Sequence, residues 1–352
     1  MKLDADVLIV GGGPAGLACA IRAAMAGLSP VIIESTPGTI DKACGEGLMP
    51  GAIRSLDEMG VRPMASHLFE GIRYISGERV AEGRFPKGPG RGVRRLALHD
   101  ALRERAEELG VTWHHARAGE IQQDDTSVEV AGLRGRWLVA ADGLNSGIRR
   151  QLGLERPARR SRPRLGLRQH YAVRPWSPHV EVYWSDDAEA YVTPVDDELV
   201  GVAVLFSGAP LPPGRGAQSR YNTLLERFPT LKARLTQPAS ILRGSGPFER
   251  RTSQRTAGRV LLIGDAAGYL DPLTGEGVRL GFATAKAAIA RIQQDRPQAY
   301  ERDWRQITRR YWWMTGGLLW LRDQPRLRPL MLPALQASPW MFSQIVGALA
   351  DD

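Results

Sequence analysis

Cysteine and histidine, the residues that build disulfide frameworks and most transition-metal sites, are scarce in this sequence. Its 352 residues include 2 cysteines and 6 histidines. Cys19 and Cys44 form neither a C-x-x-C redox pair nor a zinc-binding spacing. The neighbouring His114 and His115 would face opposite sides of a strand, so they could not ligate one ion together. We therefore expect no metal ion and no disulfide framework.

Long apolar runs and blocks of like charge are missing as well. The longest apolar run of the C-terminal part, residues 311–321, is too short to span a bilayer and favours a packed helix over an interfacial one. The formal net charge is +9, yet no run of five or more basic residues occurs, which disfavours nucleic acid as a partner. The basicity suits an anionic dinucleotide, and peripheral contact with a membrane stays open.

The remaining composition is that of an ordinary globular protein. Hydrophobic residues make up 43% and charged residues 24% of a chain that is long enough for one large or two intimate domains. The first predicted strand begins at about Asp6, which leaves no room for a signal peptide, so we expect a cytoplasmic location. Nothing in the composition predicts the oligomeric state.

The most informative stretch surrounds that first strand. Residues 6–10 predict a buried parallel strand and residues 17–24 an alanine-rich helix. The loop between them has the pattern G-x-G-x-x-G, in which Gly11 permits the tight turn, Gly13 lets a pyrophosphate approach and Gly16 lets the helix pack closely. Its full sequence is Gly11-Gly-Gly13-Pro14-Ala15-Gly16. The stretch predicts a dinucleotide-binding unit with phosphates at the helix N-terminus.

Three acidic residues follow short apolar strands elsewhere in the chain. Glu34 ends the second strand and is placed to accept hydrogen bonds from a ribose diol. Asp142-Gly143 and Gly264-Asp265 form similar acid–glycine turns after later strands. The second turn continues into a helix at 278–293, whose N-terminus could stabilise negative charge on a bound ring. The residues that open this helix are Pro272, Gly275 and Gly277.

The pattern between these turns changes at about residue 158. Four segments there, at 164–174, 180–184, 190–193 and 199–206, predict antiparallel strands of a second sheet. Two stretches rich in glycine and proline, at 83–92 and 208–216, predict loops.

The three motifs, in this order, resemble the FAD-dependent monooxygenases of the para-hydroxybenzoate hydroxylase type and their relatives, the geranylgeranyl reductases and flavin-dependent halogenases. The resemblance implies that the first motif holds the ADP pyrophosphate and that Glu34 holds the adenosine ribose. It places Asp265 on the ribityl or pyrophosphate side and Asp142-Gly143 near the pyrophosphate and a nicotinamide donor. The turn from Pro272 to Gly277 would lie beside the isoalloxazine. Arg95, in Arg-x-x-Leu-His, is similar to the FAD-contacting arginine of the reductases.

A loop near residue 45 is similar to the Cys-Gly-Gly loop of the geranylgeranyl reductases. It contains Cys44, Gly45 and Gly47, but Glu46 replaces the central glycine. The reductase pattern Tyr-x-Trp-x-Phe-Pro, aligned on Pro194, is replaced by Glu189, Tyr191 and Thr193. The Trp-x-Trp-x-Ile-Pro pattern of the halogenases fails at the same positions. These departures argue against a long prenyl substrate and against halogenation.

We predict an α/β fold with a Rossmann-like FAD-binding domain around a parallel sheet, an antiparallel-sheet substrate domain and C-terminal helices. The FAD-binding domain would comprise 1–70, 93–158 and 250–295, and the substrate domain 71–92 and 159–249. Residues 296–352 would form the helical segment. A second G-x-G-x-x-G is absent from the sequence, so NADPH or NADH would bind only transiently.

The function expected first is an NAD(P)H-dependent monooxygenase that hydroxylates or epoxidises a small organic substrate, with non-covalent FAD. A reductase of carbon–carbon double bonds comes second, and a non-enzymatic carrier of the same fold third. A carboxyl buried beside the flavin could serve as acid or base near neutral pH. We therefore expect Glu46 to handle a proton, and Cys44 and Tyr191 to shape the pocket.

Overall fold

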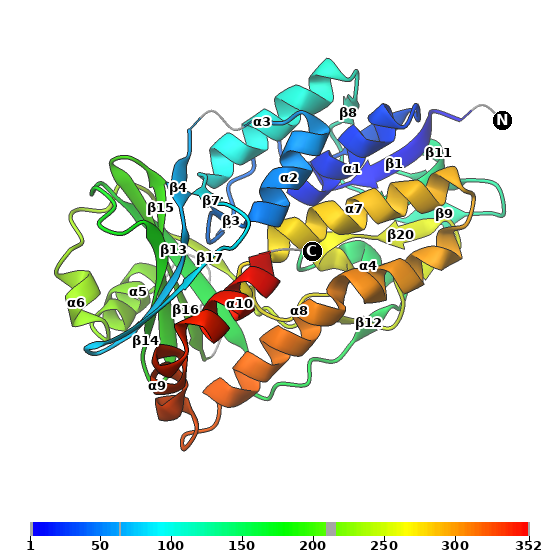
Figure 1. Ribbon diagram of the computed structural model, residues 1–352. Coiled ribbons are helices and arrows are strands. Elements are labelled where there is room, and N and C mark those ends of the chain that lie inside the picture. Colours follow the sequence, from blue (N-terminus) through cyan, green and yellow to red (C-terminus); the bar gives the residue numbers. More distant parts are fainter. Residues whose placement is uncertain (1–2, 63–64, 209–215, 351–352) are drawn as a thin grey trace.

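The computed structural model describes residues 3–62, 65–208 and 216–350. The loop predicted at 208–216 lies outside these residues apart from its two ends. Figure 1 shows a parallel sheet flanked by helices at one end of the molecule and an antiparallel sheet at the other. The long C-terminal helix α8 runs along both parts.

The parallel sheet has the almost entirely buried strand β1 near its centre. β1 (Ala5–Val10) pairs with β11 (Leu133–Ala140) on one side and with β2 (Pro30–Ile33) on the other. The parallel order continues to β20 (Val260–Leu262) at one edge and β8 (Thr112–His114) at the other. Short antiparallel additions are β9 (Ile121–Gln123), β10 (Val128–Val130) and β19 (Thr256–Ala257).

Helices from distant parts of the sequence cover this sheet. α1 (Pro14–Met25) packs against α3 (Arg95–Glu108) and α7 (Gly277–Gln293). α7 also contacts α2 (Pro50–Met59) and α8 (Tyr300–Arg322). The short α4 (Gly147–Gln151) follows β11. The carboxyl ends of β1, β11 and β20 therefore open onto loops from three separate stretches of sequence.

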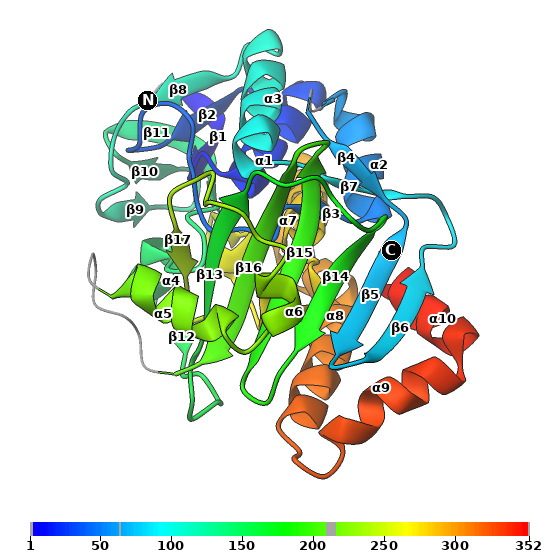
Figure 2. The same cartoon turned by 90° about the vertical axis from the view of Figure 1, so that its left-hand side faces the viewer.

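The antiparallel sheet is built mainly from a meander. Its order is β17 (Arg243–Ser245), β13 (Arg164–Tyr171), β16 (Leu199–Ser207), β15 (Ala188–Asp196), β14 (His179–Trp184), β5 (Gly71–Ser76) and β6 (Arg79–Arg84). β5 joins β14 in parallel, which brings an early hairpin into this sheet. α5 (Ala217–Leu225) and α6 (Pro229–Lys232) cover its outer face (Figure 2).

A third, small sheet comes from segments on both sides of the β5–β6 hairpin. It consists of β3 (Gly47–Leu48), β7 (Gly90–Gly92) and β4 (His67–Phe69), and a separate pair joins β12 (Glu155–Arg156) to β18 (Arg251–Thr252). The prediction of a loop at 83–92 was therefore wrong at both ends, because β6 extends to Arg84 and β7 begins at Gly90. Gly90 has room for no side chain, since a Cβ there would lie 2.5 Å from the ring of Phe69.

The C-terminal helices close the antiparallel sheet at its edge. α9 (Arg328–Ala337) and α10 (Pro339–Ala350) both pack on β6. No helix within the described part of the chain is long and apolar enough to cross a bilayer. The predicted fold class is confirmed, with a parallel sheet, antiparallel sheets and C-terminal helices. The domain boundaries given above stay a prediction.

Buried charges fasten α8 to the antiparallel sheet. Arg164 on β13 donates to Asp271 Oδ2 at 2.7 Å and to Glu189 Oε2 on β15 at 2.9 Å. Arg322 at the end of α8 donates to the other oxygen of Glu189. All four side chains are buried. Burial costs each ion hydration, so the network holds only because each carboxylate meets a guanidinium.

We predict that Arg322→Met destabilises the folded protein by about 3 kcal/mol, because it leaves Glu189 with one cation in a buried site. The free energy of unfolding, measured by urea denaturation, checks this. Arg309→Met, an exposed change on the same helix, should shift it by no more than about 0.5 kcal/mol. Equal stability of the two variants would contradict a structural role for the network.

Candidate active site

The glycine loop after β1 is shaped by two close backbone approaches. Gly11 adopts φ +109°, and a Cβ there would lie 2.4 Å from the carbonyl oxygen of Ala141. A Cβ on Gly16 would lie 1.9 Å from the carbonyl oxygen of Gly11. Side chains at these positions would push β1, β11 and α1 apart. Pro14 starts α1 and Ala15 lies against Gly264 and Gly281, where added Cβ atoms would be 3.1 and 3.2 Å away.

Glu34 braces the same loop from the end of β2. Its carboxylate accepts the backbone N–H of Gly12 at 2.9 Å and that of Thr36 at 2.7 Å. Partial burial pushes the pKa of Glu34 up, but these N–H donors and the charge of Lys42 outweigh it and leave the pKa below its ordinary value. Glu34 is therefore an ionised acceptor at neutral pH beside the loop.

Arg95 is a buried cation that points at the loop from α3. A Cβ on Gly13 would find one neighbour, Arg95 Nη2, at 3.8 Å. The Nε of Arg95 is buried and has no hydrogen-bond partner. Burial lowers the pKa of Arg95, while the nearby Cys44, Asp265 and Glu46 raise it. Gly13 thus leaves room for an anion to approach the loop, with the cationic guanidinium of Arg95 beside it.

The two acid–glycine turns meet through Arg149, whose side chain is fully buried. Its guanidinium donates to the carbonyl oxygens of Leu144 at 2.9 Å and Ala266 at 3.1 Å. Asp142 Oδ2 accepts the N–H of Ile148 at 3.2 Å, whereas its buried Oδ1 has no partner. Gly143 adopts φ +79°, and a Cβ on it would lie 3.9 Å from Lys42 Nζ.

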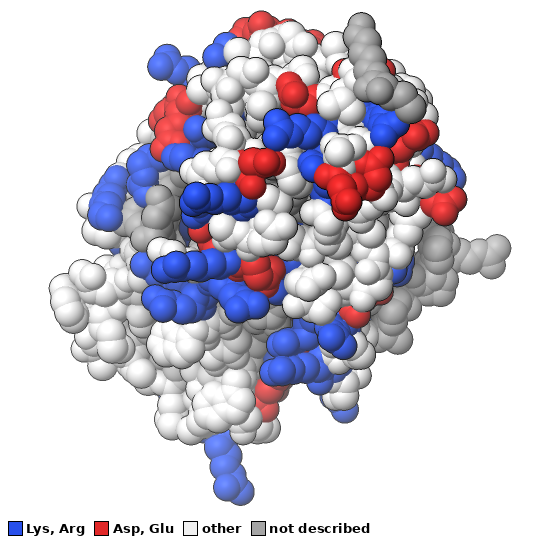
Figure 3. Space-filling model, turned by 90° about the vertical axis from the view of Figure 1, so that its right-hand side faces the viewer, with Lys and Arg blue, Asp and Glu red and all other residues white. Residues whose placement is uncertain are grey.

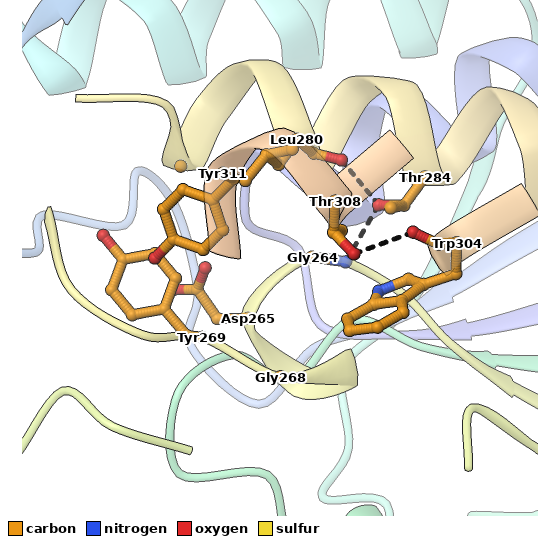
Figure 4. Close-up of a pocket in the computed structure, with 10 residues that line it drawn as sticks. Gly264, Asp265, Gly268, Tyr269, Leu280, Thr284, Trp304, Thr308 and Tyr311 are labelled. Carbon is orange, nitrogen blue, oxygen red and sulfur yellow. Dashed lines mark hydrogen bonds between the residues drawn. The ribbon is translucent and has the colours of Figure 1, made fainter. Parts of the chain in front are cut away.

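Asp265 lines a pocket with an empty volume of about 270 Å³, counting space open to solvent. Figure 4 shows its carboxylate with the rings of Tyr269 and Tyr311, whose centroids are 6.0 Å apart. Burial raises the pKa of Asp265 to about 6, against the opposing charges of Arg95, Lys42 and Arg149. Gly264 and Gly277 line the same pocket.

The turn before α7 contacts the antiparallel sheet and the loop at residue 45. The hydroxyl of Tyr191 on β15 donates to the carbonyl oxygen of Leu273 at 3.1 Å, within the 3₁₀ turn Pro272–Thr274. Thr193 donates to the carbonyl oxygen of Gly45 at 2.8 Å. Gly275, at φ +71°, would carry a Cβ 3.3 Å from the side chain of Met49. These contacts bring together the loop at residue 45, strand β15 and the turn before α7.

Glu46 is buried at 3% exposure and has a left-handed backbone at φ +59°. Its Oε1 accepts the backbone N–H of Arg95 at 2.8 Å, and its Oε2 lies 2.6 Å from Nε2 of His170. The Nδ1 of His170 faces Arg168 Nη1 at 3.1 Å. Since a guanidinium can only donate, Nδ1 is the acceptor and Nε2 carries the proton that His170 donates to Glu46.

Cys44 lies directly beside this carboxylate, and the N–H of Glu46 points to its sulfur at 3.4 Å. Burial raises the pKa of the Cys44 thiol, partly offset by the charge of Arg95. The thiol therefore stays protonated at neutral pH and acts as a small apolar wall. Cys19 and Cys44 are both free thiols, and Cys19 is buried inside α1.

His170 and Arg168 are site residues that the motifs did not reveal. Both lie on β13, together with Arg164, and the three occupy alternating positions of one strand. Alternate residues share a face, so the run Arg-x-Gly-x-Arg-x-His contained the signal of a polar inner face. Glu189, one of the departures from the reductase pattern, lies in the ion network with Arg164 and Arg322.

These residues fit a flavin dinucleotide. Arg95 Nε is a buried donor without a partner, and the guanidinium of Arg95 lies beside Gly13 in the loop that would hold the phosphates. Glu34 offers an ionised acceptor at the end of β2, where the ribose of such a ligand lies in dinucleotide-binding sheets. The fold and these groups define a dinucleotide-binding flavoprotein.

Comparison with known proteins specifies the family. The family model described as an FAD binding domain matches residues 4–292, and the chain belongs to this family. Menaquinone reductase of Mycobacterium tuberculosis is 30% identical over 82% of this chain and 77% of its own length. Digeranylgeranylglycerophospholipid reductase 1 of Methanopyrus kandleri is 27% identical over 83% of this chain and 82% of its length.

A solved p-nitrophenol 4-monooxygenase from Pseudomonas putida has the same fold, with a TM-score of 0.82 and 21% identity over 100% of this chain and 99% of that one. The predicted resemblance is confirmed. The protein is an FAD-dependent oxidoreductase, and the non-enzymatic carrier is not supported.

We predict that the purified protein carries one non-covalent FAD, which acid precipitation releases. Gly13→Trp should lose most of the cofactor because the indole would occupy the phosphate position. Asp265→Ala should lose most of it because a charged acceptor is removed. Flavin absorbance per protein chain measures both. Leu68→Trp, which adds the same side chain at an exposed position, should keep full FAD content, and FMN in place of FAD would refute the assignment.

A second prediction concerns flavin-stripped protein. Burial raises the pKa of Asp265 from 3.8 to about 6, so the folded chain binds its proton more tightly than the unfolded chain. The contribution of the neutral Asp265 carboxyl to the free energy of unfolding is fully present below about pH 4, and it is lost as the pH rises through 6.

Asp265→Asn stays neutral throughout. It should match the parent below about pH 4 and exceed it by roughly 2 kcal/mol above pH 7, allowing for partial solvent exposure. Urea denaturation across this pH range measures the difference. A constant difference at all pH values would contradict the raised pKa.

Proposed function

We propose that this protein is a reductase that uses NADPH or NADH as a transient electron donor and saturates a carbon–carbon double bond of an isoprenoid or related natural product. FAD, when bound, supplies hydride transfer to a substrate and can also react with O₂. The observation that carries the proposal is the buried pair of Glu46 and His170 in the loop at residue 45. The names of the reductases to which the chain is similar agree with it.

A double bond that accepts a hydride also needs a proton, and Glu46 can relay the one that His170 Nε2 donates to it. Glu46 is a carboxyl held away from bulk water next to Cys44. His170 Nε2 is 2.6 Å from it and can return a proton after each turnover. The reaction then balances, since one hydride and one proton add across the bond.

The proton can reach His170 from outside. Ser240 Oγ lies 2.8 Å from His170 Nδ1, and Ser240 is only partly buried. Arg168 holds the ring in place through Nδ1 and is itself fixed by Asp41 at 3.0 Å. Ser240, His170 and Glu46 therefore form a continuous path for a proton from the surface to the loop.

Cys44 and Tyr191 have positioning roles in this proposal. The Cys44 thiol stays neutral and fills space beside Glu46. Burial raises the pKa of Tyr191 well above its ordinary value, so its hydroxyl remains a donor to Leu273 and fixes the turn at 272–274. Neither side chain is expected to transfer a proton.

Monooxygenation is the second candidate, and departures from the reductase pattern favour it. Glu46 stands where the Cys-Gly-Gly loop has glycine, and Tyr191 and Thr193 replace the aromatic pattern before Pro194. The sequence alone ranks this function first. We rank it second because the buried Glu46–His170 pair meets the proton requirement of reduction directly.

A single-turnover experiment separates the two candidates. Holoenzyme reduced by NADPH without oxygen is mixed with an isoprenoid alkene that has no quinone ring, and flavin absorbance is followed. Reduction predicts anaerobic reoxidation and a product heavier by two hydrogens. Reoxidation that requires air, with a product heavier by one oxygen, would overturn the proposal in favour of monooxygenation.

We predict that Glu46→Gln and His170→Gln each slow the second half-reaction by about 10²-fold, the usual contribution of a positioned acid or base. FAD content and the rate of flavin reduction by NADPH should stay near those of the parent. Cys44→Ser and Tyr191→Phe should lower turnover less. Glu181→Gln, which alters a buried carboxylate on β14, is the matched control and should react normally. Normal turnover in all four site variants would place the chemistry elsewhere.

A further inference from the structure

Exposed large apolar side chains gather on the C-terminal helices. Trp313 and Trp320 on α8 are 78% and 58% exposed, and Trp340 at the start of α10 is 73% exposed. Leu327, Leu330 and Met341 are also exposed in this part of the chain. The other exposed large apolar residues of the described chain are dispersed: Leu3, Met25, Leu68, Val80 and Ile241.

The exposed face of α8 combines tryptophan with arginine. Arg302, Arg309, Trp313 and Trp320 are separated by seven, four and seven residues, so they lie along one side of the helix. All four are exposed. Trp304, Tyr311 and Leu319 on the opposite side are buried. The core therefore already takes its aromatic residues from the inner face, and packing does not account for the outer ones.

Charge on this segment is almost entirely positive. Residues 304–350 contain six arginines and one acidic residue, Asp323, a difference of 6 − 1 = +5. Of these arginines, Arg322 is buried beside Glu189, and Arg305 and Arg328 pair with Glu301 and Asp186. Asp323 is itself paired with Arg160 at 2.7 Å. Figure 3 shows basic and acidic side chains interspersed over the upper part of another side of the molecule. The C-terminal segment thus stands out in its exposed apolar groups, which lie beside the exposed Arg302 and Arg309.

The end of α8 and helix α9 lie at the same end of the molecule in both ribbon views (Figures 1 and 2). This end carries Trp320, Leu327 and Leu330. Trp313 lies seven residues before Trp320 on α8, and Trp340 lies at the start of α10. We call these five residues, with Met341, the tryptophan surface.

We propose that the tryptophan surface docks the protein on an anionic lipid bilayer. Tryptophan is favoured at the boundary between headgroups and acyl chains, and arginine is attracted to lipid phosphates. Leu327, Leu330 and Met341 would enter the acyl boundary beside the indoles. A flat anionic surface satisfies both features at once, whereas a nucleic acid would leave the leucines and Met341 exposed. The binding is peripheral.

Cosedimentation of the holoenzyme with vesicles tests the proposal. The parent should bind vesicles of phosphatidylcholine mixed with phosphatidylglycerol, and bind phosphatidylcholine alone far less. Trp313→Ser/Trp320→Ser/Trp340→Ser should lower the partition coefficient by at least about tenfold. Arg302→Glu/Arg309→Glu should lower it on the anionic vesicles without removing an apolar group.

The matched control is Met25→Ser/Leu68→Ser/Ile241→Ser, which removes three exposed apolar side chains elsewhere and should bind like the parent. FAD content reports that each variant is folded. Equal vesicle binding by the tryptophan variant and the parent would overturn the proposal. A parent that binds no vesicles but forms a dimer, which the tryptophan variant dissociates in size-exclusion chromatography with light scattering, would also overturn it and assign the surface to a second copy.

Discussion

The buried guanidinium of Arg149 is the interaction on which the arrangement of the site depends. It joins the loop after β11 to the loop after β20, which are more than a hundred residues apart in sequence, by donating to carbonyl oxygens of both. Its counterion is Glu155 at 3.2 Å. A buried arginine is costly unless its donors are used. Because the donors end on backbone carbonyls, Arg149 fixes the course of the chain itself, and Asp142 and Asp265 arrive together at the carboxyl edge of the parallel sheet.

Local patterns were sufficient for the parts of the structure that depend on neighbours in sequence. The sequence predicts the buried strand before Gly11, the helix after it and the acid–glycine turns, because each of these features depends on residues that are adjacent in sequence. The pair of Glu46 and His170 could not be predicted this way, because 124 positions separate them. The alternation of Arg164, Arg168 and His170 with Leu165 and Leu167 on β13 indicates a polar face, but it does not indicate which distant residue that face meets.

The interface between the two large sheets is polar in a way that sets their relative position. Three side chains from one face of β13 reach across it: Arg164 to Asp271, Arg168 to Asp41 and His170 to Glu46. The other face of β13 packs Leu165 and Leu167 into a separate apolar core under α5 and α6. Apolar surfaces tolerate sliding, whereas paired buried charges lose several kcal/mol when misplaced. The side chains of β13 thereby fix the position of the antiparallel sheet relative to the predicted flavin-binding loops.

Glu46 adopts a backbone conformation that favours glycine, and the contacts of its side chain outweigh that strain. A left-handed conformation costs a non-glycine residue of order 1 kcal/mol, and glycine would remove that cost. Glycine would also leave the N–H of Arg95 and Nε2 of His170 without an acceptor, since Glu46 supplies one oxygen to each. Each orphaned buried donor costs about 1–3 kcal/mol. The cost of backbone strain is therefore smaller than the cost of two orphaned donors. Glu46 fixes the positions of Arg95 and His170 relative to each other. The group proposed to move a proton is thus also the group that connects the dinucleotide loop to the antiparallel sheet.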